Sequence, residues 1–218
     1  MKLEALVFDA YGTLYDVHSV AQRCESFWPG KGAPLSQLWR AKQLEYTWQR
    51  SLMRRYAPFS TVTREALAYA CEALGLELTA ERMEAVMGEY NMLAAYPDVE
   101  NALQSFRRAK QAILSNGSPD MLEPLVAHSG LKFDAVLSVE ELKVYKPAPE
   151  VYELAVRKLQ VERENIGFVS SNCWDAAGAK SFGFTVYWIN RAGAPLDRLG
   201  FSPDGVLSGL GELPGKLA

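Results

Sequence analysis

Short apolar segments rich in strand-forming residues recur along this chain and alternate with helical patterns. The segments are ALVF (5–8), AILS (112–115), AVLS (135–138), IGFVS (166–170) and TVYWI (185–189). Near-continuous apolar runs of this length are typical of strands that are buried on both faces of a parallel sheet. The helical patterns between them cover 98–109, 119–129, 149–160 and 175–182. The alternation predicts an α/β fold with a doubly wound, Rossmann-like parallel sheet and right-handed crossovers.

The connection between the first two segments is far longer than an ordinary loop. Residues 17–95 contain no convincing strand. Amphipathic patterns there predict helices at 19–28, 35–56, 61–74 and 79–93. We therefore expect an inserted helical cap subdomain over 17–95 and an α/β core domain formed by 1–16 and 96–218. Most apolar residues of this cap are expected to pack inside it, and a spare face for self-association is an open alternative.

The composition argues against several classes of protein. The net charge of −3 argues against a nucleic-acid-binding protein, and no run of 18 apolar residues predicts a membrane span. The start of the chain has no basic segment followed by a long apolar run, so no signal peptide is expected. Cys24, Cys71 and Cys173 are odd in number and far apart, which favours reduced thiols in a cytoplasmic protein.

Positive charge is concentrated in the expected cap. Residues 31–64 contain seven basic residues and one acidic residue, Glu45. Most of these basic side chains are expected on solvated helix faces. One or two that turned inward would offer a binding site for an anion.

Polar residues follow the predicted strands at their carboxyl ends, which is where doubly wound sheets bind their ligands. They are Asp9, Ser115, Asn116, Lys146, Ser170, Ser171, Asn172 and Asp175. A single aspartate of this kind is often only a helix cap, and most lysines are simply solvated. Ser118 before Pro119 predicts a helix start, whose free N–H groups form a ready anion site. Because several polar strand ends converge on one crevice, the sequence predicts a functional site there.

Six motifs spread over residues 8–193 strengthen this hypothesis. They are FDAYGTLYDVHSV, LWRAKQLEYTW, LSNGSP, VYKP, FVSSNCWDAAGAK and YWINRAG. Taken together they resemble the haloacid dehalogenase superfamily, and specifically the L-2-haloacid dehalogenases. The resemblance implies hydrolytic dehalogenation of (S)-2-haloalkanoic acids to (R)-2-hydroxyalkanoic acids and halide. It also implies a small-molecule substrate and a homodimer.

The same resemblance implies a role for each matching residue. Asp9 is similar to the nucleophile that forms an aspartyl ester, Thr13 to its neighbour in the turn, and Arg40 to the receiver of the departing halide. The remaining catalytic positions that it implies are Ser115, Lys146, Ser170, Asn172 and Asp175. The substrate-binding positions that it implies are Ala10, Tyr11, Arg40, Leu44, Phe59, Ser115, Asn116, Tyr152 and Trp174.

Two positions argue against magnesium and for a reaction without a metal or another cofactor. Tyr11 replaces the second acid of the Asp-x-Asp motif of superfamily phosphatases, which protonates an alkoxide leaving group. A halide departs as a stable anion and needs no proton. Ser171 replaces an acid that would help to hold Mg²⁺, and only Asp175 of that motif is kept.

Two alternatives stay open from the sequence alone. One is a Mg²⁺-dependent phosphatase of the same superfamily. The other is a non-catalytic phospho-acceptor module, since receiver domains also combine a strand-end aspartate with Lys-Pro. Halogen preference, chain length at C2 and acceptance of fluoroacetate are not separated by these motifs.

Overall fold

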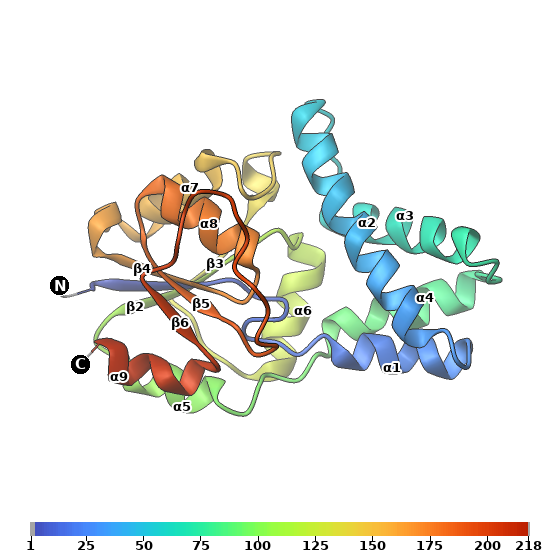
Figure 1. Ribbon diagram of the computed structural model, residues 1–218, viewed down its shortest axis with the longest axis horizontal. Helices are drawn as coiled ribbons and strands as arrows, with labels where there is room; N and C mark the ends of the chain where they lie inside the picture. Colours follow the sequence, from blue (N-terminus) through green and yellow to red (C-terminus); the bar gives the residue numbers. More distant parts are fainter. Residues whose placement is uncertain (1–2, 218) are drawn as a thin grey trace.

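The computed structural model describes residues 3–217, so residues 1, 2 and 218 of the expected core domain lie outside the described residues. Within this part of the chain, six parallel strands form one sheet in the order β3-β2-β1-β4-β5-β6 (Figure 1). Their bounds are β1 Ala5–Phe8, β2 Lys110–Ser115, β3 Ala135–Ser138, β4 Ile166–Ser170, β5 Thr185–Ile189 and β6 Gly205–Leu207. The predicted doubly wound α/β fold is confirmed.

Strand β1 lies at the centre of the sheet, between β2 and β4. Phe8 at its end is in register with Ile113 of β2 and Val169 of β4. The chain winds outward from β1 in one direction through β2 and β3, and then in the other through β4, β5 and β6. The strand order therefore reverses between β1 and β4, and a crevice for a ligand is expected at their carboxyl ends.

Core helices cover both faces of this sheet. In Figure 1, α7 (Pro149–Leu159) and α8 (Cys173–Phe182) lie on one face, and α5 (Val99–Ser105) and α9 (Leu213–Leu217) on the other. Helix α6 (Pro119–Ser129) follows β2 and brings its first turn to the carboxyl end of the sheet.

Four α-helices lie between β1 and α5 in the chain, beside the sheet in Figure 1. They are α1 His18–Phe27, α2 Gly32–Leu52, α3 Phe59–Ala73 and α4 Ala80–Gly88. These helices occupy the predicted positions, although α2 ends four residues earlier than 35–56 predicts and α4 ends five residues earlier than 79–93 predicts. One side of α2 is fully or almost fully buried and consists of residues four apart: Leu35, Trp39, Gln43 and Thr47. This stripe packs α2 against the neighbouring helices.

No helix within residues 3–217 has both the length and the apolar character that crossing a membrane requires.

Candidate active site

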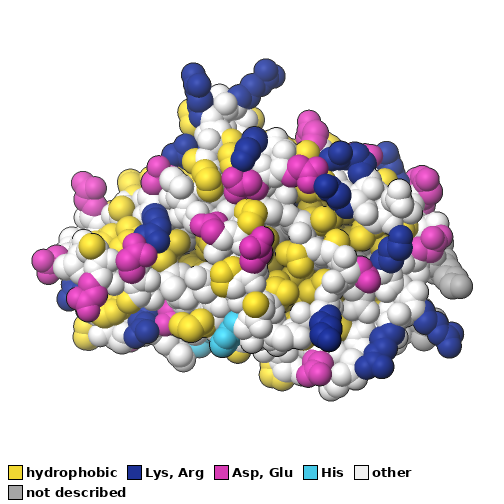
Figure 2. All heavy atoms as spheres, turned by 180° about the vertical axis from the view of Figure 1, so that it is seen from behind, with side chains coloured by type: hydrophobic (Ala, Val, Ile, Leu, Met, Phe, Trp, Pro, Cys, Tyr) yellow, Lys and Arg dark blue, Asp and Glu magenta, His cyan; other side chains and the backbone are white. Residues whose placement is uncertain are grey.

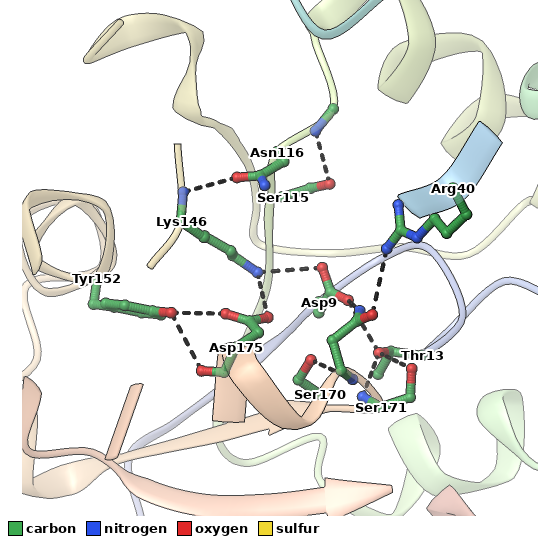
Figure 3. Close-up of polar contacts among 12 residues, drawn as sticks. Asp9, Thr13, Arg40, Ser115, Asn116, Lys146, Tyr152, Ser170, Ser171 and Asp175 are labelled. Atoms are coloured by element: carbon green, nitrogen blue, oxygen red, sulfur yellow. Dashed lines mark hydrogen bonds and ion pairs between the residues drawn. The ribbon is translucent and has the colours of Figure 1, made fainter. Parts of the chain in front are cut away.

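The ammonium group of Lys146 lies between two carboxylates at the carboxyl end of the sheet (Figure 3). Its Nζ is 3.2 Å from Oδ1 of Asp9 and 2.8 Å from Oδ2 of Asp175. The exposed fractions are 6% for Asp9, 1% for Lys146 and 0% for Asp175. Charges at this depth are stable only when they are paired. The three side chains therefore form one buried ionic cluster with a single cation for two acids.

Burial and charge shift the pKa values of Lys146 and Asp175 for different reasons. Burial disfavours the charged form of Lys146, but the charges of Asp175 and Asp9 outweigh it and raise the pKa of Lys146 above its usual value. Burial raises the pKa of Asp175, although Lys146 opposes this shift. A carboxylate with a raised pKa is a stronger base, which suits proton abstraction from water.

Tyr152 on α7 orients the other oxygen of Asp175. Its hydroxyl donates to Oδ1 of Asp175 at 2.8 Å, and burial together with the charge of Asp175 raises the pKa of Tyr152 well above its usual value. The hydroxyl therefore stays protonated and remains a donor. Tyr152 is 0% exposed, so the structure places this expected substrate-binding residue behind Asp175.

The second oxygen of Asp9 is held by the loop after β4 and by its own turn. Its Oδ2 accepts from Nδ2 of Asn172 at 2.8 Å and from the hydroxyl of Thr13 at 3.2 Å. The Thr13 hydroxyl also accepts from the backbone N–H of Ser171, at 2.8 Å. With Lys146 on Oδ1, both oxygens of Asp9 have fixed positions before any substrate arrives.

Arg191, which the sequence analysis missed, holds the turn that carries Asp9. Its guanidinium group donates to the carbonyl oxygens of Gly12 at 3.0 Å and Thr13 at 3.1 Å, and lies 3.7 Å from the ring centre of Tyr96. Gly12 has a φ of +80°, which glycine adopts without strain. Arg191 follows the end of β5 by two residues, so the rule applied to the other strand ends would have found it.

Arg40 connects the long helix α2 to the loop after β4. Its Nη2 donates to Oδ1 of Asn172 at 3.3 Å, and its Nη1 donates to Oε1 of Gln43 at 2.6 Å. Of the seven basic residues in 31–64, this one faces the site, as Figure 3 shows. Arg40 is thus linked to Asp9 by two hydrogen bonds, both of which Asn172 makes.

Ser115 and Asn116 end β2 beside the start of α6. Ser115 accepts from the N–H of Gly117 at 3.0 Å, and Asn116 accepts from the N–H of Lys146 at 3.0 Å. Ser118 occupies the N-cap position of α6, but its side chain makes no capping hydrogen bond and instead accepts from the N–H of Ser60 on α3 at 3.2 Å. Its hydroxyl therefore joins α6 to α3.

A cavity of about 480 Å³ opens beside Arg40 and Asn172. Tyr11 and Leu44 also line it, so four of the expected site residues face the same space. Burial raises the pKa of Tyr11 well above its usual value, and its buried hydroxyl has no hydrogen-bond partner within residues 3–217. A neutral group therefore stands where a phosphatase would carry its second acid.

The remaining expected positions support this site from their own elements. Phe59, at the start of α3, stacks on Tyr11 with ring centres 6.1 Å apart. Trp174, on α8, packs edge-on against Trp48 of α2 at 5.5 Å. Ala10 is fully buried, and its carbonyl accepts three N–H groups of the turn. Ser170 is fully buried and accepts from the N–H of Asn172 at 3.1 Å.

Within the described residues, no three His, Cys, Asp or Glu side chains are grouped so that they could hold a metal ion. The two acids of the site are instead bridged by the ammonium group of Lys146.

Known proteins resemble this chain along almost its whole length. Residues 3–183 match the family model of haloacid dehalogenase-like hydrolases. The chain is 49% identical over 215 residues to (S)-2-haloacid dehalogenase H-109 of Pseudomonas putida, which covers 97% of this chain and 96% of that protein. The solved L-2-haloacid dehalogenase of Xanthobacter autotrophicus has a TM-score of 0.92 and 44% identity, and covers 98% of this chain and 97% of its own. A second structure of that enzyme holds covalently bound chloropropionic acid, with the same TM-score, identity and coverage.

The buried Asp9–Lys146–Asp175 cluster at the central strand end and these similarities along the chain lead to the same assignment: the chain belongs to the haloacid dehalogenase-like hydrolase family.

Proposed function

We propose that this protein hydrolyses (S)-2-haloalkanoic acids to (R)-2-hydroxyalkanoic acids and halide. The observation that carries the proposal is the Asp9 carboxylate, which both Lys146 and Asn172 fix at the end of the central strand. A solved relative with 44% identity holds covalently bound chloropropionic acid. An ester formed on a nucleophilic carboxylate would be a covalent linkage of this kind.

In the first step, an oxygen of Asp9 attacks C2 of the substrate from the side opposite the halogen. The new C–O bond forms as the carbon–halogen bond breaks, and the halide leaves with the bonding electron pair. Arg40 places positive charge where the halide charge develops. Lys146 pairs with Oδ1 of Asp9 at 3.2 Å and holds the attacking carboxylate in place.

In the second step, water attacks the carbonyl carbon of the aspartyl ester rather than C2. Asp175 accepts the proton of that water, a role that its raised pKa favours. Ser170 and Asn172 support the loop beside the ester. The acyl C–O bond then breaks, and the 2-hydroxy acid leaves with the oxygen that Asp9 supplied and with the proton that Asp175 had accepted. Asp9 is regenerated as a carboxylate, and because C2 is attacked only once, its configuration is inverted.

The substrate is held by its carboxylate and by its apolar part. We place the carboxylate at Ser115, Asn116 and the first turn of α6, because helix starts bind anions. The apolar part lies against the residues expected from the sequence: Ala10, Tyr11, Leu44, Phe59 and Trp174, with Tyr152 in support.

Chloride release from the two enantiomers of 2-chloropropionate, with and without EDTA, tests the proposal. We expect release from the (S)-enantiomer, which EDTA leaves unchanged because the reaction needs no metal. Activity that EDTA abolishes, or turnover of phosphate esters instead, would favour the phosphatase. A stable phospho-adduct on Asp9 without turnover would favour the phospho-acceptor module.

Single turnover in heavy-oxygen water tests the ester intermediate. The first product should carry ordinary oxygen from Asp9, and the label should appear in the Asp9 carboxylate. Label in the first product would mean that water attacks C2 directly.

Three further properties belong to this proposal. Residues 17–95, with α1 to α4, act as a cap subdomain on the core formed by 1–16 and 96–218. The protein works as a cytoplasmic homodimer. Leu52 and Met53, at the end of α2, are 85% and 61% exposed and provide apolar surface for that contact. Figure 2 shows this end of α2 projecting from the body of the molecule.

A further inference from the structure

Gln43 is a fully buried amide on α2, three residues beyond Arg40. Its Oε1 accepts from Nη1 of Arg40 at 2.6 Å, and its Nε2 donates to Oγ1 of Thr63 on α3 at 2.8 Å. The Thr63 hydroxyl donates to the carbonyl of Phe59 at 2.7 Å. Gln43 and Thr63 are both 0% exposed. These hydrogen bonds therefore form one chain that runs from Arg40 to the start of α3.

The two ends of this chain, the Arg40 guanidinium group and the Phe59 carbonyl passed on through Thr63, determine the direction of every hydrogen bond in it. A guanidinium group has only donors, so the amide oxygen of Gln43 must face it. The amide nitrogen then faces Thr63, whose oxygen must accept, and the Thr63 proton is left for the carbonyl of Phe59. Turning the Gln43 amide over would place N–H groups against N–H groups at Arg40. The chain thus has one arrangement of protons, which fixes the side-chain orientation of Gln43.

The two contacts of the guanidinium group differ in length and in burial. The bond to Gln43 is 2.6 Å long and ends on a side chain without solvent exposure, whereas the bond to Asn172 is 3.3 Å long. A short hydrogen bond from a cation to a buried neutral acceptor is among the stronger polar contacts in proteins. Gln43 is therefore the main anchor of Arg40, and the Nη2 side remains available at the cavity.

We propose that Gln43, oriented by Thr63, is the positioning residue that aims the Arg40 guanidinium group at the departing halide. This inference rests on the proposed dehalogenation, in which Arg40 stabilises halide charge. A displacement of about 1 Å in a catalytic group can cost a factor of about 100 in rate. The chain also ends on Phe59, so it ties the halide-stabilising cation to a residue of the expected substrate pocket.

Two changes test the chain at separate points. Gln43→Leu removes the acceptor of Arg40, and Thr63→Val removes the hydroxyl that orients Gln43 while keeping the volume. We expect each to lower kcat/KM for (S)-2-chloropropionate about 100-fold. The loss should be smaller with (S)-2-bromopropionate, because bromide departs more readily and needs less stabilisation. A structural defect would lower both substrates equally.

Matched variants separate this role from folding. Thr63→Ser keeps the hydroxyl and should restore activity to within about threefold of the unmodified protein. Thr47→Val makes the same change at another fully buried threonine of the α2 interface, whose hydroxyl donates to the Leu44 carbonyl at 2.6 Å, and should leave both substrates unaffected. If Gln43→Leu does not fold, Gln43→Glu takes its place in the test. This change keeps the shape but places a negative charge beside Arg40, and it should mainly slow the reaction of the chloride substrate.

The possible outcomes separate the two proposals. Equal losses for chloride and bromide, activity in Gln43→Leu and Gln43→Glu like that of Thr47→Val, or no rescue by Thr63→Ser would overturn the role of Gln43 alone. Absence of halide release by the unmodified protein would overturn the proposed function, and this inference with it.

Discussion

Lys146 is the residue on which the buried charges of the site depend. It lies within 3.2 Å of one carboxylate and 2.8 Å of another, with only 1% of its own surface exposed. Bringing two acids to this depth without a cation would leave like charges facing each other in a medium of low polarity. The same ammonium group thus stabilises the fold and holds the nucleophilic carboxylate in place.

The first prediction at this scale concerns Lys146→Met. Breaking a buried ion pair by removing one partner costs about 3–5 kcal/mol, so we expect a loss of this size in urea unfolding at neutral pH. Lys146 lowers the pKa of Asp175, so its removal raises that pKa further. A group whose folded pKa is raised destabilises the protein as pH rises past its unfolded pKa. The loss should therefore shrink in acid.

Lys180→Met provides the control. Lys180 pairs with Asp204 at 2.7 Å, but both side chains are about one-third exposed, so its removal should cost less than about 1 kcal/mol. Equal effects of the two substitutions would contradict the importance of the buried cluster.

The second prediction concerns Tyr152→Phe and the pH dependence of kcat, because Asp175 acts in the second step, after the halide has left. The Tyr152 hydroxyl lowers the pKa of Asp175, while burial, which raises it, is unchanged in the variant. The pKa of Asp175 should therefore rise, and the acidic limb of the profile should move to higher pH. Tyr15→Phe removes another buried tyrosine hydroxyl, which contacts Ser129, and should not move that limb. An unmoved limb in Tyr152→Phe would mean that Asp175 is not the base.

The sequence identified some of these residues and not others for a physical reason. Asp9, Lys146 and Asp175 could be predicted because parallel strands bring their carboxyl ends together whatever the details of packing. Gln43 could not, because the spacing of the α2 stripe shows which positions share a face but not which hydrogen bonds a buried amide makes. The 2.6 Å contact with Arg40 depends on where α3 packs.

At the level of whole elements, the five longer strands and most helices were predictable and the last strand was not. Each of β1 to β5 contains an apolar run, such as AIL within β2, whereas β6 has three residues, of which Val206 is 53% exposed. Such a short edge strand has too little periodicity to be distinguished from a loop. It forms because the neighbouring β5 offers unpaired backbone groups, as Leu207 shows by accepting from the N–H of Asn190 at 2.7 Å.

The third prediction, at this scale, concerns the link between the segment after β5 and the turn after β1. Arg191→Lys cannot reach both carbonyl oxygens of Gly12 and Thr13 in the fork geometry of a guanidinium group. We expect a loss of about 1–3 kcal/mol in the free energy of unfolding and a fall in kcat of about 10- to 100-fold, because the turn carrying Asp9 is loosened.

Arg163→Lys is the matched control for this change. Arg163 also lies over an aromatic ring, 4.7 Å from the ring centre of Phe182. Its side chain is more exposed than that of Arg191, and it lies outside the site. It should change stability by less than about 0.5 kcal/mol and leave kcat as it is. A normal kcat in Arg191→Lys would show that the turn holds its geometry without this link.

At the scale of the whole molecule, helices α1 to α4 and the elements around the sheet depend on each other for the site. Arg40 comes from α2, Asn172 from the loop after β4 and Asp9 from the turn after β1. Further contacts join the same two parts, such as the hydrogen bond from Ser60 to Ser118. The helical character of this segment was evident from the sequence because no strand pattern interrupts 17–95. Its packing against the core was not, because it depends on single polar contacts between side chains far apart in the chain.

The last prediction concerns assembly, which the end of α2 should control. Leu52 and Met53 are exposed far more than apolar side chains usually are, on a helix end that projects from the molecule (Figure 2). If this end packs against a second copy, Leu52→Glu with Met53→Glu places four carboxylates in a twofold interface, where burying them is costly. We expect sedimentation of the unmodified protein at twice the chain mass and of the double variant at the chain mass. Leu199→Glu with Phe201→Glu, on an exposed loop, should leave the dimer intact. A dimer that only the loop pair dissociates would place the contact at the loop and not at the end of α2. An unmodified protein that sediments as a monomer would mean that no second copy covers the exposed Leu52 and Met53.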